Sequence, residues 1–375
     1  MSERVAVIKN HYTPYGGAEK YTTRIVEAFA RRGFGVDVLT SSRWEWDAAS
    51  VTRVPIAAAS LNSLLRVYTF NENCRRHLEK NLARYRCVLS MDRTDTATHI
   101  RAGGGSHRAW LDRRGRFMSR ARRLTLALNP FHRLVLEIER RSIACPHLRK
   151  LVCNSRMVQR EFIEIHGVAE GRTAVVHNGV QWGAFAAPFE AALAEGARLK
   201  RELGLAPDAF HFLFVGSGYA RKGLHFALEA LRRLPADCRL VVVGQDRSEA
   251  RYRRLAERAG VAGRVTFAGA QRDVVPYLQA CDAFVLPTIY DPFSNATVEA
   301  LAMGLYVVTT AANGCAEIMS DGSGAIVRDL DDPDELLAAM QGALVGHDRR
   351  AIRDSVRGYE FEGKLEELIR ICVES

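Results

Sequence analysis

Short apolar runs alternate along the chain with segments in which apolar residues recur every three to four positions. The first apolar run occupies residues 4–10. After a Gly-Gly turn, Tyr21, Ile25 and Phe29 recur every four residues, and a second apolar run follows at 36–40. This order predicts a strand, a helix and a second strand, which together form a βαβ unit with parallel strands.

The same alternation continues through both halves of the chain and predicts an α/β fold. Further strands are expected at 87–91, 151–155, 173–179, 211–217, 239–245, 264–269, 283–288, 306–310 and 325–329. A stretch rich in Gly, Pro and Ala near residue 185 separates the halves. We therefore predict two Rossmann-like parallel-sheet domains at 1–185 and 186–355, and an amphipathic helix at 356–375 that docks back on them.

The composition limits where the chain works. Its eight cysteines are scattered without a Cys-x-x-Cys pair, which indicates reduced thiols in a cytosolic protein. No stretch reaches the roughly 18 apolar residues of a membrane span, and the N-terminus lacks the apolar region of a signal peptide. We expect a soluble protein or one that rests on a surface.

The net charge of +10 favours polyanionic partners such as nucleic acid, an anionic membrane or a phosphorylated glycolipid. Nucleic acid is disfavoured because no aromatic platform or known binding motif appears. Residues 113–141 contain nine arginines against two glutamates, with apolar residues interleaved, which suits an anionic membrane surface. An ordinary surface helix is the alternative, since the whole chain has 46 arginines and only seven lysines.

Two glycine turns follow strands and precede helices, where backbone N–H groups can approach a phosphate. The first is Gly16-Gly17. The second begins at Gly216 and ends in Arg221 and Lys222, which supply positive charge. The spacing of this second turn does not fit a dinucleotide-binding fingerprint, but an ordinary strand-to-helix turn remains an alternative.

Two carboxylates, Asp291 and Glu299, lie eight residues apart. We expect Asp291 on a loop and Glu299 just inside the helix that follows. A helix start offers free N–H groups and a positive dipole end, so two carboxylates beside it indicate a ligand with both phosphate and hydroxyl groups. Alternatively, Asp291 is a turn residue and Glu299 only favours the helix dipole.

A metal site is not expected. Asp329 and Asp331 form an Asp-x-Asp pair, but Asp332 and the proline after it predict an ordinary helix start. No His/Cys cluster has the spacing of a metal site. Arg221 and Lys222 are therefore expected to neutralise a bound phosphate.

Four segments together resemble the retaining glycosyltransferases of family 4, which have the GT-B fold of two Rossmann-like domains facing across a cleft. In the family's order they are residues 11–33, 152–162 with 174–180, 216–223 and 286–310. The last segment is the most specific, because it resembles the family's pair of acidic residues separated by seven. Within the family, the chain is most similar to bacterial lipopolysaccharide core glucosyltransferases.

The resemblance implies a nucleotide-sugar donor, UDP-glucose, held mainly by the second domain. Glu299 would bind the ribose hydroxyls, Arg221 and Lys222 the diphosphate, and Asp291 the transferred sugar. The family usually has Glu where this chain has the shorter Asp291, which leaves a non-catalytic scaffold protein of the same fold as an alternative. Further donor-side positions are Gly16, Gly17, Gly216, Phe293, Ser294 and Asn295.

The resemblance also implies transfer with retention, by a front-face path in which the departing phosphate assists the incoming hydroxyl, with no cofactor besides the nucleotide sugar. Asp95, His99 and His107 lie in a polar, glycine-rich stretch and are candidates to orient or deprotonate the acceptor hydroxyl, with His99 as the catalytic candidate. Each could instead only bind backbone or solvent. The predicted acceptor is a lipid-anchored lipopolysaccharide core glycan at the inner face of the cytoplasmic membrane.

Overall fold

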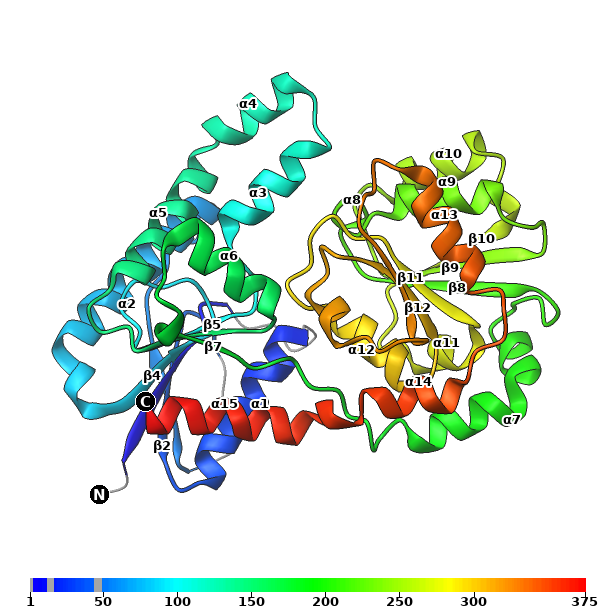
Figure 1. Ribbon diagram of the computed structural model, residues 1–375. Coiled ribbons are helices and arrows are strands. Elements are labelled where there is room, and N and C mark those ends of the chain that lie inside the picture. Colours follow the sequence, from blue (N-terminus) through cyan, green and yellow to red (C-terminus); the bar gives the residue numbers. More distant parts are fainter. Residues whose placement is uncertain (1–2, 12–16, 44–48) are drawn as a thin grey trace. The chain divides into compact units, whose positions relative to one another are not determined.

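The computed structural model describes residues 3–11, 17–43 and 49–375, with the backbone alone for residues 17–20. The chain divides into two compact units (Figure 1). Unit 1 contains residues 1–177 and 362–375, and unit 2 contains residues 178–361.

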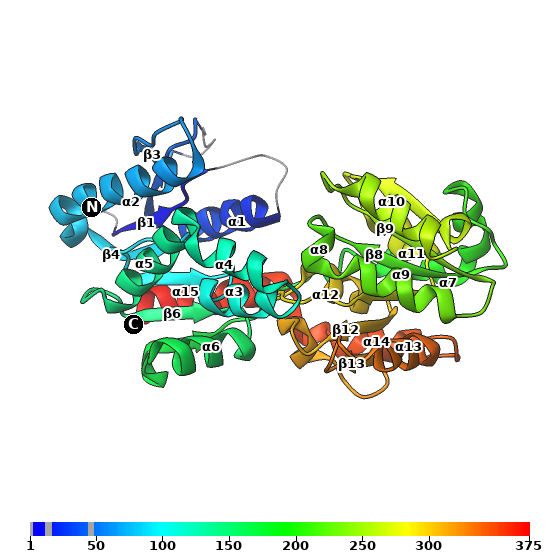
Figure 2. The same cartoon turned by 90° about the horizontal axis from the view of Figure 1, so that it is seen from above.

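Unit 1 is built on a seven-stranded sheet in the order β3-β2-β1-β4-β5-β6-β7, with all neighbouring strands parallel. The strands are β1 (Arg4–Ile8), β2 (Gly35–Thr40), β3 (Val51–Pro55), β4 (Tyr85–Ser90), β5 (His99–Ala102), β6 (Lys150–Cys153) and β7 (Thr173–Val175). The α-helices are α1 (Gly17–Arg31), α2 (Ser63–Asn81), α3 (His107–Arg116), α4 (Arg120–Leu128), α5 (Pro130–Ala144), α6 (Arg156–His166) and α15 (Phe361–Glu374). Figure 2 shows α3 and α4 together with the other helices that surround this sheet.

Unit 2 has a six-stranded sheet in the order β10-β9-β8-β11-β12-β13, again with parallel neighbours. The strands are β8 (Phe210–Val215), β9 (Cys238–Val243), β10 (Val265–Gly269), β11 (Ala283–Leu286), β12 (Tyr306–Thr310) and β13 (Gly324–Val327). The α-helices are α7 (Ala186–Glu202), α8 (Tyr219–Lys222), α9 (Leu224–Arg233), α10 (Glu249–Arg258), α11 (Val275–Ala280), α12 (Asn295–Ala302), α13 (Pro333–Gly342) and α14 (Arg349–Ser355).

Each sheet has a point where the strand order reverses. In unit 1 this point lies between β1 and β4, and in unit 2 it lies between β8 and β11. Open α/β sheets bind ligands outside the carboxyl ends of the strands at such a switch point. The loops that follow β1, β4, β8 and β11 are therefore the places to look for functional side chains.

The predicted α/β class with two parallel sheets is confirmed, and each expected strand in unit 2 is present. The central strands β8, β9, β11 and β12 are recognisable because they are buried on both faces and read as continuous apolar runs. Two strands of unit 1, β3 and β5, were not predicted. β5 contains His99 and Arg101 within its four residues, both buried, so its composition is that of a polar loop.

The unit boundaries lie close to a crossing of two chain segments. Unit 2 spans 178–361, whereas the sequence predicts 186–355. Backbone hydrogen bonds of 2.9 Å join Val180 to Tyr359 and to Phe361. These bonds hold both connecting segments on unit 2.

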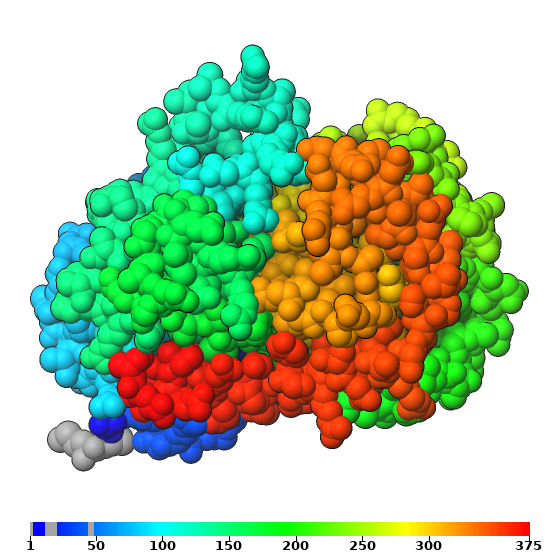
Figure 3. Space-filling model, viewed as in Figure 1, coloured from blue at the N-terminus to red at the C-terminus, as the bar shows by residue number. Residues whose placement is uncertain are grey.

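The C-terminal helix α15 packs on unit 1 through one apolar face. Leu365, Leu368 and Ile369 are fully buried there. At the end of the helix, the carbonyl of Val373 accepts from the Arg86 guanidinium at 2.9 and 3.1 Å. Figure 3 shows α15 in red along this face.

We predict that the crossing at Gly179 tolerates no side chain. A Cβ on Gly179 would lie 2.4 Å from the Cα of Phe361, whereas a Cβ on Gly183 would meet nothing within 4 Å. Gly179→Ala should lower the free energy of unfolding by about 1–3 kcal/mol, because backbone must shift. Gly183→Ala, the control, should change it by less than about 0.5 kcal/mol. Chemical denaturation measures both, and equal effects would contradict the close packing.

Candidate functional site

Two loops meet at the switch point of unit 2, after β8 and after β11. The first contains the single-turn helix α8, flanked by Gly218 and Gly223 with φ angles of 75° and 77°. A Cβ on Gly223 would lie 1.8 Å from the carbonyl oxygen of Pro287 in the second loop. Only glycine fits here, because the position needs both a left-handed conformation and the absence of a side chain.

Hydrogen bonds fix the two loops to each other at Arg221. Its carbonyl oxygen accepts from the Ile289 N–H at 2.9 Å and from the Thr288 hydroxyl at 2.9 Å. The close approach at Gly223 permits these bonds. The positions of Arg221 and of the residue after it are therefore set by the loop that carries Asp291.

Asp291 is buried beside Lys222 and Arg221. Its Oδ2 accepts from Lys222 Nζ at 2.5 Å and from one terminal nitrogen of Arg221 at 3.2 Å. Burial alone would raise the pKa of the Asp291 carboxyl, but the charges of Lys222 and Arg221 outweigh burial and hold this pKa below its usual range. The three side chains form an ion cluster, which we call the Asp291 cluster, in which Asp291 and Lys222 are buried and Arg221 is partly exposed.

The helix α12 begins immediately after this cluster. Ser294 is its N-cap and accepts from the Thr297 N–H, while Asn295 begins the helix and is exposed. The side chain of Asn178 donates to Asn295 Oδ1 at 2.9 Å. Glu299 lies one turn further along α12 and is half-buried. The helix start thus places N–H groups and a positive dipole end beside two cations.

A third loop, which follows β9, binds the loop that follows β8. Asp246, which follows β9, accepts from the Tyr219 N–H at 2.7 Å, and the Tyr219 hydroxyl donates to Gly244 O at 2.9 Å. Gly216 gives room to the chain of Lys222, since a Cβ there would lie 3.0 Å from Lys222 Cε. Sequence reasoning did not assign Asp246, because a strand-end Asp has no local pattern that distinguishes support from solvation.

The predicted donor-side residues of unit 2 therefore lie on connected loops. Arg221 and Lys222 both contact Asp291. Phe293 lies between Asp291 and the N-cap Ser294 in the sequence, and its side chain is buried. In unit 1, Gly17 is the first residue of α1, and Gly16 lies outside the described residues.

His99 lies away from the carboxyl ends of the strands. It is the first residue of β5 and is fully buried, with Nδ1 at 2.9 Å from the Thr98 hydroxyl and Nε2 at 2.9 Å from the Ser375 hydroxyl. The ring also contacts Cys87 Sγ at 3.3 Å. These contacts hold the His99 ring within the protein interior. We leave His99 out of the proposed site, because parallel sheets bind ligands at the carboxyl ends of their strands and His99 lies at the amino end of β5.

His107 begins α3 and packs against other rings. Its Nε2 lies 3.1 Å from His132 Nδ1, and its ring stacks on Trp110. Burial, together with the charge of Arg93, lowers the pKa of His107 to about 4, so the ring is neutral at pH 7. Asp95 lies in the loop after β4, where burial raises its pKa and its Oδ1 has no hydrogen-bond partner among the described residues.

The switch point of unit 1 holds another ion pair that sequence reasoning missed. Lys9, after β1, donates to Asp92 Oδ1 at 2.9 Å, and the Asn10 N–H donates to Asp92 Oδ2 at 2.7 Å. The two residues are more than 80 positions apart, so only the adjacency of β1 and β4 brings them together.

A buried carboxylate anchors the start of α3. Glu139 on α5 accepts from the His107 N–H at 2.8 Å and from Arg93 Nε at 3.0 Å, with His166 Nε2 at 3.2 Å. Burial alone would raise the pKa of Glu139, but the hydrogen bond with His166 and the charge of Arg93 lower it to about 2. Glu139 thus ties α3, α5 and α6 together as a carboxylate.

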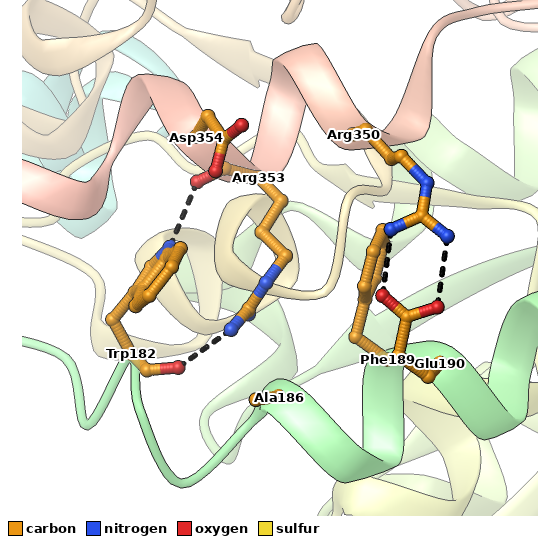
Figure 4. A pocket seen from close by; sticks show the side chains of 7 residues that line it. All are labelled: Trp182, Ala186, Phe189, Glu190, Arg350, Arg353 and Asp354. Carbon is orange, nitrogen blue, oxygen red and sulfur yellow. Dashed lines mark hydrogen bonds and ion pairs between the residues drawn. The ribbon is translucent and has the colours of Figure 1, made fainter.

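A pocket in unit 2 lies apart from these loops, between the start of α7 and α14 (Figure 4). Arg353 stacks on Trp182 with its guanidinium carbon 4.1 Å from the ring centroid and donates to the Trp182 carbonyl at 2.8 Å. Arg350 binds Glu190 through two hydrogen bonds of 2.6 and 2.8 Å. The polar groups at this pocket bind one another, which is typical of a structural joint.

The part of the chain that the structure describes contains no group of three or more His, Cys, Asp or Glu side chains arranged to hold a metal ion. Among the same residues, no helix is both long and apolar enough to cross a membrane.

The helix start predicted at Asp332 is confirmed, since its side chain accepts from the Asp334 N–H at 2.9 Å.

Two Rossmann-like sheets, with cations and a helix start at the second switch point, are features of the GT-B glycosyltransferases. Two family models match the chain. One, described as glycosyltransferase family 4, matches residues 15–181, and the other, described as glycosyl transferases group 1, matches residues 209–345. Together they cover most of the sequence, and the chain belongs to the family 4 glycosyltransferases.

Curated relatives narrow the resemblance. The chain is 33% identical over 161 residues to the lipopolysaccharide core biosynthesis glycosyltransferase LpsE of Rhizobium meliloti, covering 43% of this chain and 47% of that protein. It is 31% identical over 150 residues to the lipopolysaccharide glucosyltransferase WaaG of Escherichia coli, covering 39% and 40%. In both cases the match spans less than half the length of the relative.

Solved structures agree in fold. The crystal structure of WaaG, a glycosyltransferase involved in lipopolysaccharide biosynthesis, gives a TM-score of 0.80 at 22% identity, covering 99% of this chain and 100% of that one. The structure of Anabaena HepE in complex with UDP-glucose gives 0.68 at 17% identity, covering 99% and 100%. The predicted GT-B fold is therefore confirmed.

We predict that the Asp291 cluster contributes strongly to stability. Asp291→Asn keeps the shape of the side chain but leaves the buried Lys222 without a counter-charge, so the free energy of unfolding should fall by about 3 kcal/mol. The control is Glu229→Gln, which breaks an exposed pair with Arg232 and should cost less than about 1 kcal/mol. Urea denaturation measures both variants. Equal, small losses would contradict the burial of the cluster.

Proposed function

We propose that this protein transfers a hexose from a nucleotide sugar to a hydroxyl group of a glycan acceptor. The observation that carries the proposal is the Asp291 cluster beside the start of α12. Two cations and the first N–H groups of a helix suit a diphosphate, while carboxylates at the same place suit sugar hydroxyls. Membership of the family 4 glycosyltransferases supports this assignment.

The donor we propose is UDP-glucose. Arg221 and Lys222 would bind the diphosphate, Glu299 the ribose hydroxyls and Asp291 the glucose. Support comes from two relatives: HepE was solved in complex with UDP-glucose, and WaaG is a lipopolysaccharide glucosyltransferase. The assignments of the transferred sugar and of the base rest on these two proteins.

The cations are well prepared for a diphosphate. Lys222 carries three N–H donors and makes its described hydrogen bond with Asp291 alone, and Arg221 uses one terminal nitrogen for its described side-chain bonds. Both side chains therefore retain donors for phosphate oxygens. We propose that these two residues, and not a metal ion, neutralise the leaving group.

Transfer would proceed with retention of the anomeric configuration. The bond between the anomeric carbon and the β-phosphate oxygen breaks, and the acceptor oxygen bonds to the same face of that carbon. The acceptor proton passes to the departing phosphate oxygen, so that UDP and the glycoside are the products. Catalysis then depends on alignment and on stabilising the negative charge of the diphosphate, which Arg221 and Lys222 supply.

The acceptor we propose is a hydroxyl group of a lipopolysaccharide core or a related glycan, in line with the activities named for LpsE and WaaG. The polar residues at the switch point of unit 1 are the candidates to bind it. Asp92, held by Lys9, follows β4, and Asp95 lies three residues further on. Asp92 takes the place of His99 among the acceptor-side candidates and Asp95 remains one, because both follow the carboxyl end of a strand.

We propose that residues 113–141 rest on an anionic membrane, so that the chain acts peripherally at the inner face of the cytoplasmic membrane. In the structure, α4 projects from unit 1 and contains no buried residue (Figure 1, Figure 3). Leu124 and Leu128 on this helix are 62% and 57% exposed. Exposed leucines among arginines suit the boundary between lipid headgroups and acyl chains.

UDP should raise the melting temperature of the wild-type protein, because a ligand that binds only the native state stabilises it. At 100 times its Kd this amounts to about 2.7 kcal/mol. ADP, GDP and NAD should give no comparable shift. Glu299→Ala should abolish the UDP shift, since the ribose loses its partner, whereas Glu257→Ala, on the exposed face of α10, should keep it.

The outcomes of this thermal-shift experiment separate the candidates. A well-folded sample that responds to no nucleotide would contradict the transferase. If the protein binds UDP but transfers no glucose from UDP-glucose to any core glycan, the non-catalytic scaffold protein is favoured instead.

The membrane proposal is tested by flotation with vesicles. Wild-type protein should bind vesicles that contain phosphatidylglycerol and should bind pure phosphatidylcholine weakly. Replacing Leu124 and Leu128 by Asp should reduce binding at least about 10-fold, because burial of each leucine is worth about 1.5–3 kcal/mol. Leu61→Asp is the control, since Leu61 is 81% exposed elsewhere on unit 1. Equal loss in the control, or equal binding to both lipids, would contradict this surface.

A further inference from the structure

Asn313 follows β12 and begins the short helical segment Gly314–Ile318. Its side chain is 1% exposed and makes four hydrogen bonds. Oδ1 accepts from the N–H groups of Ser294 at 3.2 Å and Cys315 at 3.1 Å. Nδ2 donates to the hydroxyls of Thr297 and Thr309, both at 3.0 Å. An amide has two donors and two acceptor positions, so every hydrogen-bonding position of this side chain is used.

These bonds hold the start of α12. Ser294 is the N-cap of this helix and Thr297 lies in its first turn. The Ser294 N–H is taken by Asn313, and the Thr297 N–H is taken by the Ser294 side chain. The N–H groups of Asn295 and Ala296, which have no acceptor within the helix, are then the ones that face a ligand.

The backbone around Asn313 holds Asp291 as well. The Asp291 N–H donates to Ala312 O at 2.9 Å, and the Gly314 N–H donates to Asp291 O at 2.8 Å. Asp291 and Asn313 are thereby paired as in a short parallel bridge. One short segment, residues 312–314, therefore fixes both the Asp291 backbone and the N-cap of α12.

The binding of a nucleotide sugar would depend on the distance between Asp291 and the start of α12. The sugar contacts are proposed for Asp291, which precedes Ser294 in the sequence, and the phosphate contacts for the helix start, which follows it. A small shift of the helix start relative to Asp291 would change both at once. Misplacements of about 1 Å reduce rates strongly, by about 100-fold in some enzymes.

We infer that Asn313 is a positioning residue of the donor site. It touches no substrate, and it holds the start of α12 and the Asp291 backbone at the spacing that a sugar diphosphate requires. This inference rests on the function proposed above. Sequence analysis did not reveal it, because an Asn-Gly pair after a strand is also an ordinary turn.

The test compares Asn313→Ala with Ser323→Ala. Ser323 is also 1% exposed in unit 2, and its hydroxyl donates to Ser320 O at 2.7 Å, so this control removes a hydrogen bond of a buried side chain away from α12. Isothermal titration gives the Kd for UDP, and turnover of UDP-glucose gives kcat and KM. Asn313→Ala should weaken UDP binding and lower kcat by roughly 10- to 100-fold. Ser323→Ala should leave both unchanged.

A second pair of variants covers the case in which Asn313→Ala does not fold. Thr297→Val removes the hydroxyl that accepts from Asn313 and keeps the shape, while Thr297→Ser keeps the hydroxyl. Thr297→Val should weaken UDP binding and lower kcat in the same direction as Asn313→Ala, and Thr297→Ser should restore both.

Three outcomes are decisive. The inference stands if Asn313→Ala or Thr297→Val loses UDP affinity and kcat while Ser323→Ala and Thr297→Ser keep them. It is overturned, with the proposed function intact, if wild type binds UDP and the variants melt at lower temperature but keep the wild-type Kd and kcat. Absence of UDP binding by the wild-type protein would overturn the proposed function and this inference together.

Discussion

The structure of the candidate site depends on the contact between the loops that follow β8 and β11. At Gly223 the two backbones approach so closely that a Cβ would lie 1.8 Å from Pro287 O. This contact lets the Arg221 carbonyl accept two hydrogen bonds from the neighbouring loop and brings Lys222 to Asp291. A buried carboxylate between two cations needs such fixed geometry, because its desolvation is otherwise uncompensated.

The same contact determines where the shorter acidic residue lies. The family resemblance leads one to expect Glu where this chain has Asp291, and the missing methylene reduces the reach of the carboxylate. In the structure both cations converge on Oδ2 of Asp291. The segment around Asn313 holds the backbone of the same residue. The loops thus set the position of the Asp291 carboxylate in this chain.

Most strands of the fold and several residues of the candidate site could be predicted from the sequence. The elements and residues that could not be predicted have physical reasons in common. The central strands of unit 2 were predicted because strands buried on both faces read as apolar runs, and Arg221, Lys222 and Asp291 could be proposed because each lies in a local motif. β5 was missed because its buried positions include His99 and Arg101. Residues that act through tertiary pairing have no local pattern, which is why Asp92, Asp246 and Asn313 were not found.

The central claim is that the Asp291 cluster and the start of α12 bind the diphosphate of a nucleotide sugar. A crystal structure of the protein grown with saturating UDP tests it most directly. The account predicts phosphate oxygens within hydrogen-bond distance of Lys222 Nζ, of the Arg221 guanidinium and of the Asn295 N–H, with the ribose on Glu299. Well-defined UDP bound elsewhere, with Lys222 and Arg221 still engaged only by Asp291, would contradict it.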